Sequence, residues 1–136
     1  MINTGTSEEA ISETEQEMGV IFPEGLKLVW RKANGFELPG GWHFYPVFDP
    51  KKPKNTANHI GYENTKGRWP HMDKSLVSIA GTNTGNQLVL KNIDNVLEET
   101  IYIWNHDTNN IHAWSQDLGH VLTQAKLRMS NIVNKK

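Results

Sequence analysis

Three apolar runs of strand length, followed by a shorter fourth, constrain the second half of this chain more than any other feature. They occupy residues 76–80, 87–90 and 101–104, and the fourth occupies residues 111–114. β-branched and aromatic residues dominate these runs and turn-forming residues separate them, a pattern typical of strands. Because the connections are too short for helical crossovers, we expect antiparallel pairing in a meander of three or four strands.

Side chains alternate between the two faces of a strand, so each run assigns its residues to a face. The pairs expected to share a face are Val77 with Ile79, Leu88 with Leu90, and Ile101 with Ile103. Loops are expected at residues 81–86, 91–100 and 105–110, of which the second is the longest.

Two helices are expected before the sheet. The first covers about residues 7–18, where Thr6 and Glu9 have the spacing of a capping box and Gly19 suits the end. Its solvated face is expected to carry Glu13, Glu15 and Glu17. The second starts at Pro23, ends at Asn34-Gly35, and buries one face made of Leu26, Val29, Trp30 and Ala33.

Between these helices and the meander, the sequence predicts a strand, a loop and a short helix. The strand is Trp42–Phe48, in which Pro46 lacks a ladder donor and so belongs at an edge or bulge. Residues 49–58 are expected to form a polar loop, and residues 56–66 a short helix that carries Ile60 and Tyr62. After the meander, an apolar stripe predicts a last helix that lies across the sheet, with Leu118, Val121, Leu122, Ala125, Met129 and Ile132.

Length and composition narrow the class of protein. The 136 residues fit one domain, with flexible ends at residues 1–5 and 134–136. With 14 basic and 15 acidic residues and no basic stripe, we expect no nucleic-acid partner. There is no cysteine, which excludes disulfides and thiolate metal sites and fits a reducing cytoplasm. No apolar run reaches the length of about 18 residues that suggests a membrane span, and the N-terminus lacks the pattern of a secretory signal.

The residues that could carry chemistry are few. The Gly81–Gly85 loop lacks the Gly-Lys-Ser/Thr ending of a phosphate-binding loop and precedes a strand, so a plain turn is the better interpretation. Among six histidines, only His106, beside Asp107 and near His112, forms a cluster, which is either a surface loop or a metal or acid–base site. No Gly-x-Ser-x-Gly elbow is present. We expect neither a metal, a cofactor nor an enzymatic activity.

Five tryptophans are many for a chain of this length. Trp30 is expected to lie in the core, whereas Trp42, Trp69, Trp104 and Trp114 are expected at strand or loop edges. Tryptophan is enriched among interface hot spots, because it removes a large apolar area from water. An aromatic core and a protein-binding face are both consistent with this pattern.

These segments together resemble the SUKH superfamily, which includes fungal cell-wall-synthesis regulators and bacterial toxin-immunity proteins. The similar motifs are Phe22-Pro23-Glu24 with Asn34-Gly35, then residues 76–81 and 85–90, and then residues 101–107, reading IYIWNHD. The resemblance runs in order over roughly residues 15–125. Asn86 and Asn105 stand where the family often has an acidic residue, and residues 49–74 match little.

The resemblance implies an α+β fold: an antiparallel or mixed sheet of about 4–6 strands flanked by helices. It also implies a non-enzymatic protein that binds a cognate protein, most often an immunity protein that neutralises a bacterial toxin such as a nuclease. An adaptor or regulatory scaffold of the same fold is the alternative, and an enzyme or ligand binder using His106 and His112 is the lesser one. The residues expected to be exposed for a partner are Trp42, Trp69, Asp94, Glu98, Glu99, Trp104 and Asp107.

Overall fold

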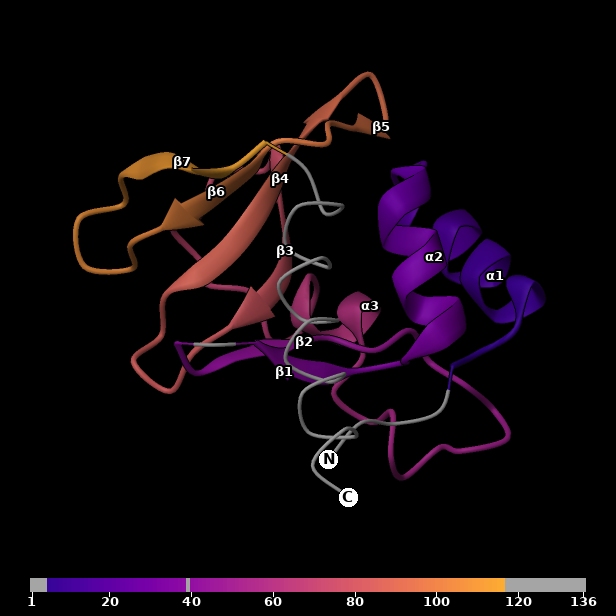
Figure 1. Ribbon diagram of the computed structural model, residues 1–136. Helices are drawn as coiled ribbons and strands as arrows, with labels where there is room; N and C mark the ends of the chain where they lie inside the picture. The colour runs from indigo at the N-terminus through magenta and orange to yellow at the C-terminus, as the bar shows by residue number, and fades with distance from the viewer. Residues whose placement is uncertain (1–4, 39, 117–136) are drawn as a thin grey trace.

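The structure is a computed structural model that describes residues 5–38 and 40–116, and it has an α+β fold (Figure 1). The described helices are α1 (Glu8–Met18), α2 (Glu24–Lys32) and α3 (Ile60–Glu63). The described strands are β1 (Phe36–Leu38), β2 (Trp42–Phe44), β3 (Leu76–Gly81), β4 (Gln87–Ile93), β5 (Val96–Leu97), β6 (Ile101–Trp104) and β7 (Ile111–Ser115). The helix predicted over residues 118–132 lies outside the described residues.

One antiparallel sheet organises the molecule. Its strands follow the order β1-β2-β3-β4-β6-β7, and β5 pairs with β4 alone among the named strands. The predicted meander is therefore confirmed as β3, β4, β6 and β7. Strand β1 was not predicted, and the expected loop over residues 91–100 is instead largely a hairpin, in which β4 continues to Ile93 and β5 follows.

The two faces of the sheet bury different residues, as the alternation predicts. Val77, Ile79, Leu88, Leu90 and Ile101 join the larger core, to which all three described helices contribute. Figure 1 shows α1 and α2 side by side on this side of the sheet. The opposite face holds a smaller core made of Met72, Leu76, Val89 and Trp104, with Trp69, Tyr102 and Ile111 packed against it. A non-helical segment that carries Trp69 and Met72 therefore covers part of that second face.

The ends of α1 confirm one prediction and correct two. Gly19 ends the helix in the left-handed conformation, with φ 68°, as predicted. The cap at the start is Ser7 and not Thr6, because Ser7 Oγ accepts from the Ala10 amide, whereas the Thr6 hydroxyl donates to Asp49. The Glu15 carboxylate is not solvated, because it accepts from the Phe22 amide at 2.8 Å and pairs with Lys27 Nζ at 3.2 Å.

The strand predicted over residues 42–48 is shorter, because its second half finds other partners. β2 ends at Phe44. The Val47 amide donates to Asn34 Oδ1 at 2.8 Å, and Asn34 Nδ2 donates to the Val47 carbonyl at 2.9 Å. The Pro46 carbonyl accepts from the Ile60 amide at the start of α3, which is also shorter than predicted. A buried asparagine side chain thus replaces the neighbouring strand that the pattern suggested.

Candidate functional site

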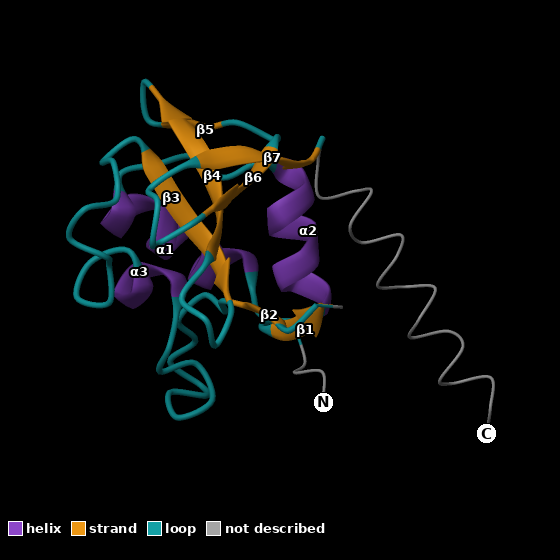
Figure 2. Cartoon of the chain, turned by 90° about the vertical axis from the view of Figure 1, so that its left-hand side faces the viewer, coloured by secondary structure: helices purple, strands orange, loops and turns teal. Residues whose placement is uncertain are grey.

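The β4–β5 hairpin projects past the first residue of β3. Its turn consists of Asp94 and Asn95, with φ angles of 52° and 67°. Positive φ at both central residues is the geometry of a type I′ turn, and aspartate and asparagine tolerate it better than most residues. Figure 2 shows the hairpin at the top of the molecule.

Three aliphatic side chains form an exposed row across this hairpin. Ile93 pairs with Val96, and Val96 forms a parallel bridge with Ile21, which lies in the segment between α1 and α2. Paired residues on adjacent strands direct their side chains to the same face, so the three lie side by side. Ile21, Val96 and Ile93 are 54%, 49% and 54% exposed, whereas Val20 and Leu97, which alternate with them, are buried in the larger core.

The charges beside this row are acidic. Asp94, Glu98 and Glu99 are exposed, and no ion pair among the described residues uses them. The basic residue on this part of β4, Lys91, holds its Nζ 4.6 Å from the centre of the Tyr102 ring. We call the exposed row and its acidic neighbours the hairpin surface, made of Ile21, Ile93, Asp94, Val96, Glu98 and Glu99.

Along β5, the backbone of the hairpin is already hydrogen-bonded to the backbone of Ile21. The Ile21 amide donates to the Asn95 carbonyl at 2.8 Å, and the Leu97 amide donates to the Ile21 carbonyl at 3.0 Å. The next amide, that of Phe22, donates to the Glu15 carboxylate. The hairpin surface therefore presents side chains and not a free strand edge.

The remaining predicted partner-binding residues are scattered. Trp104 is fully buried, with its Nε1 donating to Asn109 Oδ1 at 2.7 Å, and Trp42 is only 8% exposed, packed edge-on against Trp114. The expected exposure of these two is corrected, because the face of each strand that carries them is covered. Trp69 is half-buried and Asp107 is exposed. The structure thus brings Asp94, Glu98 and Glu99 together on one hairpin and leaves the tryptophans elsewhere.

The two histidines proposed as a cluster do not meet. The His106 ring stacks on Trp69 with ring centroids 4.9 Å apart, and Trp69 packs against the smaller core. His112 pairs with Ile103, whose side chain packs on the larger core, so His112 lies on the opposite face of the sheet. Within the described residues, no group of three potential metal ligands occurs.

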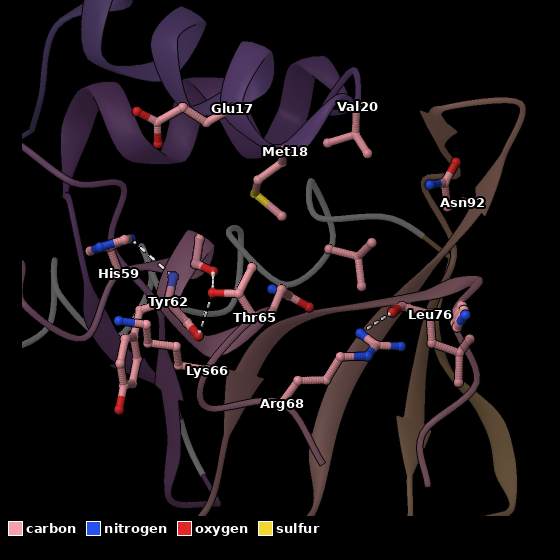
Figure 3. A pocket seen from close by; sticks show the side chains of 14 residues that line it. Glu17, Met18, Val20, His59, Tyr62, Thr65, Lys66, Arg68, Leu76 and Asn92 are labelled. Carbon is pink, nitrogen blue, oxygen red and sulfur yellow. Dashed lines mark hydrogen bonds between the residues drawn. The ribbon is translucent and has the colours of Figure 1, made fainter. Parts of the chain in front are cut away.

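A groove of about 600 Å³ lies between the end of α1, α3 and the start of β3 (Figure 3). Its charged side chains come from both walls: Glu17 lies on α1, across from Lys66 and Arg68 in Figure 3. Arg68 donates to the carbonyls of Leu76, Met72 and Asp73, so its guanidinium holds the chain that leads into β3. Asn64 likewise pairs with both backbone groups of Ser78. These polar groups secure backbone and do not form a nucleophile–base pair.

His59, on the groove wall, caps α3 through a ring nitrogen. Its Nδ1 accepts from the Tyr62 amide at 3.1 Å, and burial lowers the pKa of His59, an effect that Glu17 partly offsets. An unfolded histidine takes up its proton near pH 6.5, before the folded one does, so stability falls as the pH drops below about 6.5. We expect His59→Asn, which keeps a capping side chain, to lessen this fall between about pH 7.5 and pH 5.5.

The measurement is the urea midpoint at both pH values. His112→Asn is the matched control, because it makes the same substitution at an exposed histidine in β7, away from α3. An unaltered pH dependence in His59→Asn would show that the acid sensitivity arises elsewhere.

Sequence reasoning missed the aliphatic members of the hairpin surface. The sequence predicts a loop over residues 91–100, and a loop does not assign Ile93, Val96 and Leu97 to the faces of a hairpin. The signal was present: Asp94-Asn95 between two β-branched residues is the type of dipeptide that favours a two-residue hairpin turn. Ile21 carries no such signal, because its exposure depends on a bridge to a residue far along the chain.

Comparison with known proteins shows the family to which the sequence is similar. A sequence model of the SMI1 / KNR4 family (SUKH-1) matches residues 5–124, which is most of the chain. Among curated proteins there is no significant match. No helix in the described part of the chain combines the length and apolar character needed to cross a membrane.

Proposed function

The chain belongs to the SMI1 / KNR4 family (SUKH-1), and from this membership we propose that it is a protein-binding domain without enzymatic activity. We propose more specifically an immunity protein that acts in the cytoplasm, binds a cognate bacterial toxin domain and blocks it in a stoichiometric complex. The family supports binding of a partner protein; the toxin as partner is our inference.

The exposed aliphatic row of the hairpin surface is the observation that carries this proposal. Side chains at Ile21, Val96 and Ile93 are about half exposed although each is large and apolar. Clustered apolar side chains rimmed by polar residues mark protein interaction sites. A stable complex buries roughly 800 Å² on each partner, so the row would form the centre of a larger contact. Trp69 and Asp107 stay predicted members of that contact.

The alternative is an adaptor or regulatory scaffold of the same fold, which would use the same surface on a partner that is not toxic. The gene next to the one for this chain separates the two proposals. A neighbouring gene that encodes a toxic C-terminal domain favours immunity, whereas its absence favours the scaffold.

Co-expression with that neighbouring toxin domain tests the proposal. We expect this chain to restore growth of the host, and the purified pair to elute as a 1:1 complex. His106→Ala should protect as well as the wild type, because protection needs no catalytic histidine. Continued killing despite abundant folded protein would overturn the immunity function, and loss of protection in a folded His106→Ala variant that still forms the 1:1 complex would favour the enzyme.

A further inference from the structure

We propose that the hairpin surface is the site at which the partner docks, and that the partner presents an apolar depression ringed by lysine and arginine. This inference rests on the proposed function and assigns it a place and a chemistry. Burial in the larger core does not explain why the side chains of Ile21, Ile93 and Val96 are aliphatic, because each is about half exposed. Val20 and Leu97 fill the larger core, while the residues that alternate with them face solvent.

The geometry of the row suits a shallow depression. Adjacent strands lie about 4.8 Å apart, so three side chains in register span roughly 10 Å. The row is continuous, because Ile21, Val96 and Ile93 lie on one face of three neighbouring segments. A partner that covers it with apolar side chains removes all three from water in one contact.

The hairpin is held in place before any partner arrives. The Asn92 amide donates to the Ser75 carbonyl at 2.7 Å, and the Glu98 amide donates to the Lys91 carbonyl at 2.9 Å. The backbone hydrogen bonds to Ile21 hold the opposite edge of the hairpin in place. A surface ordered in advance loses little conformational entropy on binding, which favours affinity. The same contacts occupy the backbone edge that Ile21 covers, so recognition there proceeds through side chains and not through strand addition.

The charges select a basic partner. Asp94 lies in the turn beside the row, and Glu98 and Glu99 follow β5; none of the three has an ion-pair partner among the described residues, and Lys91 contacts Tyr102. Complementary charges on the partner would speed encounter and fix orientation. A second copy of this chain fits poorly, because a two-fold contact would bring the same acidic residues face to face.

The experiment measures binding of variants of the full chain to the purified product of the neighbouring gene, which the proposed function expects to be the toxin domain. The double variant Ile93→Ser/Val96→Ser should raise Kd at least about 100-fold, mainly through faster dissociation. Glu98→Lys/Glu99→Lys should slow association about tenfold and weaken its dependence on salt. Leu28→Ser is the matched control, because Leu28 is an aliphatic residue on α2, 50% exposed, outside the row. It should change Kd less than about twofold.

The outcomes separate this inference from the proposed function. If the wild type binds and protects but both hairpin variants bind as tightly, the function stands and the hairpin surface is not the site. If the wild type neither binds nor protects, both fail. A concentration-dependent dimer that the double serine variant abolishes would overturn the basic partner in favour of a second copy. Melting temperatures close to that of the wild type establish that the variants fold.

Discussion

Replacing Trp30 with alanine should lower the free energy of unfolding by about 3–5 kcal/mol, the range for a buried tryptophan. The Trp30 side chain is 1% exposed and meets Phe22 edge-on, with ring centroids 4.8 Å apart. Its Nε1 donates to the Tyr45 carbonyl at 3.0 Å, so alanine leaves both a cavity and an unpaired buried carbonyl. The loss is a large share of a domain's stability and should appear as a melting temperature lower by about 10–20 °C.

Trp69→Ala is the control for this experiment, because the Trp69 side chain is only half-buried. It should destabilise less than Trp30→Ala. Trp30→Phe should fall between them, since it keeps most of the apolar volume but loses the bond to Tyr45. A melting temperature of Trp30→Ala within a couple of degrees of the wild type would show that the contact between α2 and the sheet is not central to the fold.

The segments that the sequence predicts correctly are those in which the local residue pattern and the tertiary partner of the segment favour the same structure. Residues 76–80 and 101–104 read as strands, and their neighbours in the sheet are themselves strands close in sequence. The second helix is also predicted, because one of its faces is apolar, although it ends at Lys32, before the predicted Asn34-Gly35 end, and Ala33 is its extended cap. In these segments, local preference and tertiary pairing favour the same structure.

The segments that sequence mispredicts have partners that no local pattern reveals. The run 42–48 reads as one strand, yet Val47 pairs with the side chain of a single residue, Asn34. Trp104 sits in a strand whose outer face is covered by a non-helical segment carrying Met72. Whether a strand residue is buried depends on what covers its face, and here the cover comes from residues 67–73, which lack periodicity.

The candidate site likewise has one part that the sequence predicts and one part that it does not. The acidic residues Asp94, Glu98, Glu99 and Asp107 are predicted to bind a partner because they lie on loops of the meander and would attract a basic site, and the structure places all four in solvent. Their role in binding stays a prediction. The aliphatic row could not be predicted, because it needs the bridge between Ile21 and Val96, which are 75 positions apart by their numbers.

Replacing Asn34 with alanine should lower the free energy of unfolding by about 2–4 kcal/mol. Asn34 is 3% exposed and Val47 is fully buried, so the two hydrogen bonds between them lie in the interior. The asparagine satisfies both the amide and the carbonyl of Val47, as a neighbouring strand would. Its removal leaves two backbone groups without a protein partner, and each such group costs about 1–3 kcal/mol. Urea denaturation of the purified variant measures the change.

Two further variants separate the hydrogen bonds from the volume of the side chain. Asn83→Ala, in an exposed loop, should change stability by less than about 0.5 kcal/mol. Asn34→Asp keeps the shape but replaces the donor to the Val47 carbonyl with an oxygen, so it should be destabilised at neutral pH. Burial raises the folded-state pKa of the introduced carboxyl, so its penalty should shrink as the pH falls and the group regains a donor. Equal stability of Asn34→Asp and the wild type at pH 7 would mean that water can donate the hydrogen bond to the Val47 carbonyl in place of Asn34. The asparagine side chain would then not be the reason why β2 ends at Phe44.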